Sequence, residues 1–178
     1  MANYLTILRI LLIFPVLMFA SPYPGLNNWI ALTLFVIAGL TDHLDGYIAR
    51  KTGSTSSLGA LLDLVADKLL IIVTLCYFIS YTSGLLLLIP SIVIIIREIV
   101  ISAFRQFLTE KEGQNPIKVT FLAKSKTTLQ IIALSFLIIS PNFGELFCIL
   151  TIFSFWLASY VSLHSLYEYI KTYQNLLK

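Results

Sequence analysis

All four aspartates of this 178-residue chain lie in one short segment. If the chain is helical on both sides of residues 51–56, Asp42 and Asp45 share one face of the first helix, because they are three residues apart. Asp63 and Asp67 are four residues apart and share one face of the next helix. A short turn between the two helices would then bring four carboxylates around one small volume.

Four like charges require neutralising cations if they are to remain ionised together inside a membrane protein. Hard divalent ions prefer oxygen ligands, so the carboxylates predict a site for Mg²⁺ or Mn²⁺. The alternative is a structural or transport site for cations.

The composition indicates an integral membrane protein. The chain is 58% hydrophobic, has a mean hydropathy of +0.90 and has only 12% charged residues, against about 25% in an ordinary soluble domain. A water-soluble core of this size would not hide so much apolar surface. The net charge of +3 is modest, and no long polar face exists to carry a basic stripe, so we expect no nucleic acid partner. We expect one domain over residues 1–178, embedded in the lipid bilayer.

Six apolar segments predict an all-α, polytopic membrane protein with six transmembrane helices, since about 20 residues are needed to cross the hydrocarbon core. Polar, glycine-containing or proline-containing stretches separate the segments. The expected helices run over about residues 5–20, 28–50, 57–81, 85–108, 121–139 and 145–173. The second and third helices carry the aspartates near the polar turn that joins them. A charged loop, from Glu110 to Lys118, follows the fourth helix.

The distribution of lysine and arginine predicts the orientation. The connections at 21–28, 81–84 and 140–145 contain no lysine or arginine, so all 12 basic residues lie toward the opposite ends of the helices. Positively charged connections stay in the cytoplasm. We therefore expect a multi-pass protein of the cytoplasmic (inner) membrane, with both termini and the aspartate segment on the cytoplasmic side.

From Asp42 to Asp67 the chain reads Asp-x2-Asp-Gly-x2-Ala-Arg-x8-Gly-x3-Asp-x3-Asp. This spacing resembles, at all eight fixed positions, the signature of the CDP-alcohol phosphotransferase family. The resemblance implies a six-helix membrane enzyme, usually a homodimer. Such enzymes displace CMP from a CDP-linked donor with the hydroxyl of an acceptor alcohol.

The resemblance also implies a role for each residue of the signature. The four aspartates, Asp42, Asp45, Asp63 and Asp67, would hold two divalent cations, Mg²⁺ or Mn²⁺, which neutralise the pyrophosphate and the departing CMP. Asp67 would also be the general base that takes the proton of the attacking hydroxyl. The residues expected to contact the donor, CDP-diacylglycerol, are Gly46, Ala49, Arg50, Ser56 and Gly59. The small residues leave room for a nucleotide against the helix, and the arginine pairs with a phosphate.

Motifs outside this segment resemble the bacterial members of the family whose acceptor is sn-glycerol 3-phosphate. They are Asn3-x-Leu5-Thr6-x2-Arg9 with Pro15, Arg97-Glu98-Ile99 with Arg105, and Lys124-Ser125-Lys126-Thr127 with Gln130. Thr6 and Arg9 are secondary site candidates.

Four basic residues, Arg97, Arg105, Lys124 and Lys126, indicate a binding site for a second anion. The two arginines lie roughly on one face of the fourth predicted helix, and the two lysines enter the fifth from the cytoplasmic side. Cations embedded in apolar sequence usually face a bundle interior or a polar cavity, and we expect Glu98 to pair with one of the arginines. The four would bind a phosphate on the acceptor. The alternative is that they snorkel to the membrane surface and anchor the helices there.

The expected function is transfer of a phosphatidyl group from CDP-diacylglycerol to sn-glycerol 3-phosphate, which gives phosphatidylglycerophosphate and CMP. Other acceptors that fit the same chemistry are inositol phosphate, serine and phosphatidylglycerol. A divalent-cation transporter is the non-enzyme alternative. It would need a polar path across the membrane, and the predicted helices have almost no polar lining in the halves away from the aspartates.

Overall fold

The computed structural model describes the backbone of residues 2–52, 57–81, 84–112 and 121–172, without the side chains of 2–5, 42–52, 57–64, 67, 105, 108–112 and 121–125. The described residues form six α-helices and one short 3₁₀-helix. They are α1 (Ala2–Phe19), α2 (Leu26–Thr52), α3 (Ser57–Tyr81), α4 (Leu85–Glu112), α5 (Phe121–Ile139), η1 (Ser140–Asn142) and α6 (Glu145–Thr172). The prediction of an all-α protein with six helices is confirmed.

The ends of α3 and α5 lie where the sequence predicts them. The prediction for the fourth helix was wrong at its C-terminal end, because α4 continues to Glu112 and includes the first residues of the expected charged loop. Residues 109–112 contain glutamates and a lysine, which favour helices, and Gly113 is the first strong helix breaker after them.

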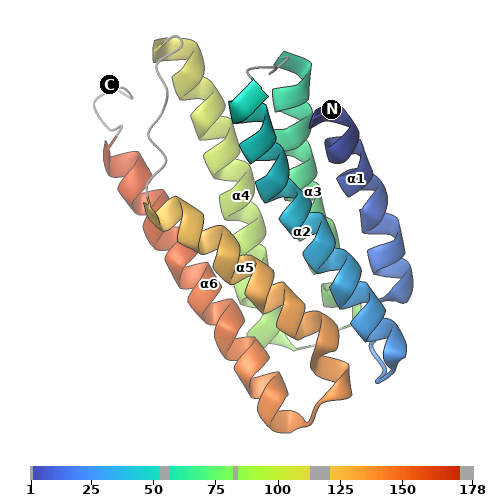
Figure 1. Cartoon of the computed structure of the whole chain (residues 1–178). Coiled ribbons are helices and arrows are strands. Elements are labelled where there is room, and N and C mark those ends of the chain that lie inside the picture. Colours follow the sequence, from blue (N-terminus) through green and yellow to red (C-terminus); the bar gives the residue numbers. More distant parts are fainter. Residues whose placement is uncertain (1, 53–56, 82–83, 113–120, 173–178) are drawn as a thin grey trace.

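Figure 1 shows how the helices pack into a bundle. α1 packs against α2 and α3, α6 packs against α4 and α5, and α2 also contacts α5. The N-terminal end of α1 and the C-terminal end of α6 lie at one end of the bundle, together with the C-terminal ends of α2 and α4 and the N-terminal end of α3. This is the end at which the sequence predicts the basic connections. Its location on the cytoplasmic side stays a prediction.

Both the interior and much of the outer surface of the bundle are apolar. Val16, Phe35 and Phe155 are fully buried between helices. On the outside, Met18 is 84% exposed and Leu146 is 75% exposed. Large exposed apolar surfaces are rare on soluble monomers, so the outer surface of this bundle fits a lipid environment.

Two helical stretches are long and apolar enough to cross a membrane by themselves: Leu85–Phe104 and Glu145–Thr172. α1, α2 and α3 contribute shorter apolar stretches, Thr6–Phe19, Leu26–Thr41 and Lys68–Tyr81. These spans are counted only over the residues with described side chains. The prediction of six transmembrane helices therefore goes further than this finding.

Pro90 lies inside α4 without breaking it. Proline has no backbone N–H, so the carbonyl of Leu86, four residues earlier, loses its helical donor. The indole Nε1 of Trp156 on α6 donates to this carbonyl oxygen at 3.0 Å. A side chain from the neighbouring helix thus replaces the missing hydrogen bond and joins α4 to α6.

Asn28 closes the bundle at the end opposite the aspartates. This residue is fully buried, and its Oδ1 accepts a hydrogen bond from the backbone N–H of Ser21 at 2.8 Å. Its Nδ2 donates to the carbonyl of Tyr23 at 2.9 Å and to Oδ1 of Asn142 at 3.4 Å. The α1–α2 connection is therefore held to η1 by side-chain amides.

Replacing Asn28 by alanine should destabilise the bundle by about 1–3 kcal/mol, because three polar groups lose a buried partner. We expect the thermal unfolding temperature of the detergent-solubilised protein to fall by several degrees. The neighbouring Asn27 is exposed, so Asn27→Ala is the matched control and should leave this temperature within about one degree. Equal effects of the two changes would contradict the role given to Asn28.

Candidate active site

The aspartate segment lies on two helices that meet at one end of the bundle. Asp42 and Asp45 are in the C-terminal part of α2, and Asp63 and Asp67 are in the N-terminal part of α3. The two helices contact each other, and Figure 1 shows these ends side by side. Carboxylates on two adjoining helices are a donor set that fits hard divalent cations.

The contacts of the signature residues with a metal or a donor stay predictions. Asp42, Asp45, Gly46, Ala49, Arg50, Gly59, Asp63 and Asp67 are described by their backbone only, and Ser56 lies outside the described residues. Among the side chains that are described, no three histidines, cysteines, aspartates or glutamates come together.

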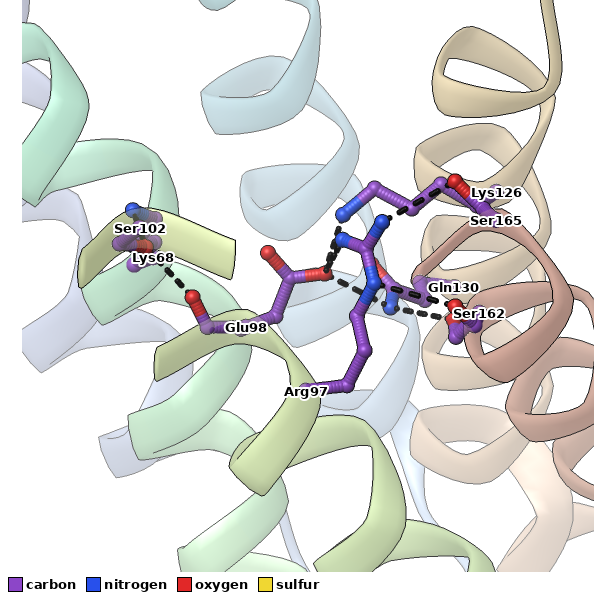
Figure 2. Close-up of polar contacts among 8 residues, drawn as sticks. All are labelled: Lys68, Arg97, Glu98, Ser102, Lys126, Gln130, Ser162 and Ser165. Carbon is purple, nitrogen blue, oxygen red and sulfur yellow. Dashed lines mark hydrogen bonds and ion pairs between the residues drawn. The ribbon is translucent and has the colours of Figure 1, made fainter. Parts of the chain in front are cut away.

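A buried polar cluster joins α4, α5 and α6 (Figure 2). At its centre, Oε1 of Glu98 on α4 accepts a hydrogen bond from Nη1 of the adjacent Arg97 at 3.1 Å. On α5, Nζ of Lys126 forms an ion pair with the same oxygen. Nε2 of Gln130, one helical turn further along α5, donates to it at 3.2 Å. One carboxylate oxygen therefore holds three donors from two helices, and the predicted pairing of Glu98 with an arginine is confirmed.

Arg97 connects this cluster to α6. Its Nε donates to the backbone carbonyl of Ser162 at 3.1 Å, and its Nη2 donates to Oγ of Ser165 at 3.1 Å. Ser159, Ser162 and Ser165 are spaced by three residues and are all buried, so they share one face of α6. Small polar residues let membrane helices approach closely and hydrogen-bond across the contact. The two hydrogen bonds to Ser162 and Ser165 hold the guanidinium group of Arg97 against this face of α6.

The described part of the cluster has one positive charge in excess. Arg97 and Lys126 are cationic and Glu98 is anionic, and their exposed fractions are only 2%, 6% and 5%. Removing charged groups from water is costly, and a buried charge needs a partner of opposite sign. Two cationic side chains on neighbouring helices are donors that suit an anionic ligand.

A further contact joins α3, which carries Asp63 and Asp67, to this cluster. Lys68 follows Asp67 directly on α3, and its Nζ donates to Oγ of Ser102 on α4. Oγ of Ser102 in turn donates to the backbone carbonyl of Glu98. The segment of α3 that carries the last aspartate is thus held next to the turn of α4 that carries Glu98 (Figure 2).

The structure brings two of the four predicted phosphate ligands together, since Arg97 and Lys126 share the carboxylate of Glu98. Arg105 and Lys124 lie on the same two helices, α4 and α5, and their side chains are outside the described residues. Thr6 and Arg9 are buried on α1, which packs against α2 and α3.

Sequence reasoning missed Lys68, Ser102, Ser162 and Ser165 as members of the site. A signal was present for Lys68 and for the two serines of α6. A lysine within the apolar part of a helix needs a polar partner. Serines repeated at a spacing of three along an apolar helix indicate a face that contacts another helix.

The chain is similar in sequence to known proteins over nearly its whole length. The sequence family described as CDP-alcohol phosphatidyltransferase matches residues 1–163. A Wigglesworthia glossinidia brevipalpis protein named CDP-diacylglycerol–glycerol-3-phosphate 3-phosphatidyltransferase is 33% identical over 166 residues, which cover 93% of this chain and 90% of that protein. A Haemophilus influenzae protein of the same name is 36% identical over 170 residues, covering 94% and 90%. One from Escherichia coli K12 is 32% identical over 167 residues, covering 93% and 90%.

Proposed function

The chain belongs to the CDP-alcohol phosphatidyltransferase family, and on this premise we propose that it is a phosphatidylglycerophosphate synthase. It would transfer a phosphatidyl group from CDP-diacylglycerol to sn-glycerol 3-phosphate. The names of the relatives support this choice of acceptor. The observation that carries it in this chain is the buried cluster around Glu98, in which the described charged side chains are Arg97, Lys126 and Glu98, because cationic donors on neighbouring helices can bind the phosphate of an acceptor.

In this proposal the donor binds at the ends of α2 and α3. Asp42, Asp45, Asp63 and Asp67 hold two divalent cations, Mg²⁺ or Mn²⁺. When bound, these ions neutralise charge on the pyrophosphate. Arg50 pairs with a donor phosphate. The remaining donor contacts are Gly46, Ala49, Ser56 and Gly59.

The acceptor binds at the cluster between α4 and α5, with its phosphate held by Lys126 and Arg97 and by Arg105 and Lys124 on the same helices. The 1-hydroxyl of glycerol 3-phosphate then attacks the phosphorus that carries diacylglycerol. The bond from this phosphorus to the CMP oxygen breaks, and the electron pair leaves with CMP. Asp67 takes the proton of the attacking hydroxyl.

The surroundings of the site are part of the proposal. We propose six transmembrane helices in one domain, both termini and the site on the cytoplasmic side of the inner membrane, and a homodimer. The apolar outer surface supports the membrane location, and the position of the first turn of α1 and the last turn of α6 at one end of the bundle supports placing both termini on one side.

The proposed reaction is tested by incubating the purified protein with CDP-diacylglycerol, Mg²⁺ or Mn²⁺, and each of a panel of acceptors. We expect CMP release with sn-glycerol 3-phosphate and very little with glycerol, because glycerol has no phosphate for the cluster. Preference for serine, inositol phosphate or phosphatidylglycerol would show that the acceptor is wrong while the family reaction stands.

Replacing Lys126 by alanine should raise the acceptor KM by about ten- to a hundredfold, because a charge-assisted hydrogen bond contributes roughly 1.5–3 kcal/mol. The KM for CDP-diacylglycerol should change little. Lys171→Ala is the matched control, since it removes one positive charge from the exposed last turn of α6, and it should leave both constants near their normal values. If Lys126→Ala changed only the KM for CDP-diacylglycerol, this result would contradict the proposal that Lys126 binds the acceptor.

A further inference from the structure

Gln130 has one polar atom that the cluster leaves unused. Its Nε2 donates to Oε1 of Glu98 at 3.2 Å and to Oγ of Ser162 at 3.1 Å, so both hydrogens of the amide nitrogen are engaged (Figure 2). Its Oε1 is buried and has no hydrogen-bond partner among the described residues. The residue as a whole is only 2% exposed.

Exchanging the positions of the amide oxygen and nitrogen of Gln130 would not give every polar atom a suitable partner. A carboxylate oxygen can only accept hydrogen bonds, so the nitrogen of Gln130 must face Glu98. A buried acceptor without a donor is unfavourable, and the great majority of buried polar groups have a partner. Since Glu98 and Ser162 fix the amide, its oxygen needs a donor from outside the cluster.

We propose that Gln130 is a specificity-determining residue that accepts a hydrogen bond from the non-reacting hydroxyl of the acceptor. This inference rests on the proposed function, in which glycerol 3-phosphate carries its phosphate on C3, the reacting hydroxyl on C1 and a further hydroxyl on C2. Lys126 and Gln130 are four residues apart on one face of α5, and both bind the same oxygen of Glu98. A phosphate held by Lys126 therefore brings the C2 hydroxyl, four bonds from phosphorus, toward Gln130.

Binding of the acceptor includes a local rearrangement, because the oxygen of Gln130 is closed to solvent. Lys126 turns its ammonium from Glu98 to the phosphate. Glu98 keeps its hydrogen bonds from Arg97 and Gln130, so its charge stays paired. The phosphate favours this exchange, since it offers Lys126 an anionic partner in place of Glu98.

The test compares two acceptors that differ only at C2: sn-glycerol 3-phosphate and 3-hydroxypropyl phosphate, which keeps the reacting hydroxyl and the phosphate. CMP release from CDP-diacylglycerol gives kcat/KM for each. We expect the unaltered protein to prefer glycerol 3-phosphate by about tenfold or more, mainly through the acceptor KM. In Gln130→Met the preference should fall to near one, because the thioether gives the C2 hydroxyl no comparable acceptor.

Ser162→Ala is the matched control. It removes a partner of the Gln130 nitrogen and leaves the Gln130 oxygen in place, so it should slow both acceptors alike and keep the preference. If Gln130→Met does not fold, Gln130→Asn, which retracts the amide oxygen by one carbon, should also weaken the preference. A preference that survives in the Gln130 variants, or that is absent from the unaltered protein, would overturn the inference while glycerol 3-phosphate remained the substrate. Failure of glycerol 3-phosphate to react at all would instead overturn the proposed function, and the inference with it.

Discussion

Asp42→Ala and Asp63→Ala are each expected to abolish CMP release from CDP-diacylglycerol. The two residues lie on different helices, α2 and α3, so each change removes a carboxylate from one side of the proposed metal site. Stabilisation of charge in the transition state by metal ions is worth several kcal/mol, so we expect a loss of at least about a thousandfold in kcat.

Metal dependence distinguishes the loss of a metal ligand from misfolding of the two variants. In the unaltered protein, excess EDTA should stop the reaction, and Mg²⁺ or Mn²⁺ should restore it and raise the unfolding temperature. Neither ion should restore the activity of the two variants or raise their unfolding temperature as much. Glu145→Ala removes an exposed carboxylate at the opposite end of the bundle and should be fully active. CMP formation at a normal rate in excess EDTA would rule out the metal site.

The helices could be predicted from the sequence because their ends are marked by strong local signals. α5 stops before Ser140-Pro141-Asn142, and α3 begins after the polar run 51–56 and ends near Gly84. The end of α4 was harder to predict, because glutamates and lysines are common both in solvent-exposed loops and in helices. Here charge alone was a poor guide to where a helix ends.

The polar cluster could be predicted only in part. Cations in apolar sequence, such as Arg97 and Lys126, need buried partners, and this requirement can be read from composition. Which partner each finds depends on how the helices are rotated against one another, and spacing within one helix carries no such information. Pattern alone therefore did not predict that one oxygen of Glu98 binds donors from two helices.

The position of Asp67 distinguishes it from the other three aspartates. It directly precedes Lys68, whose Nζ donates to Ser102, and Ser102 donates to the backbone carbonyl of Glu98. Asp67 is therefore the aspartate nearest along α3 to the contact with the cluster that would bind the acceptor. A general base must lie within reach of the hydroxyl that it deprotonates, and this placement favours Asp67 over Asp63, which lies four residues further from the contact.

Asp67→Asn should therefore lower kcat by about 10²–10⁴-fold, the usual contribution of general acid–base catalysis. An amide fills the space of the carboxylate but does not take the proton of the attacking hydroxyl. The matched control is Asp63→Asn, which changes a proposed metal ligand in the same way and should weaken metal and donor binding. In Asp67→Asn the KM for CDP-diacylglycerol should rise less than in Asp63→Asn, because its main loss is in the chemical step. Initial rates of CMP release at varied donor, acceptor and metal concentrations separate these effects, and near-normal turnover in Asp67→Asn would exclude Asp67 as the base.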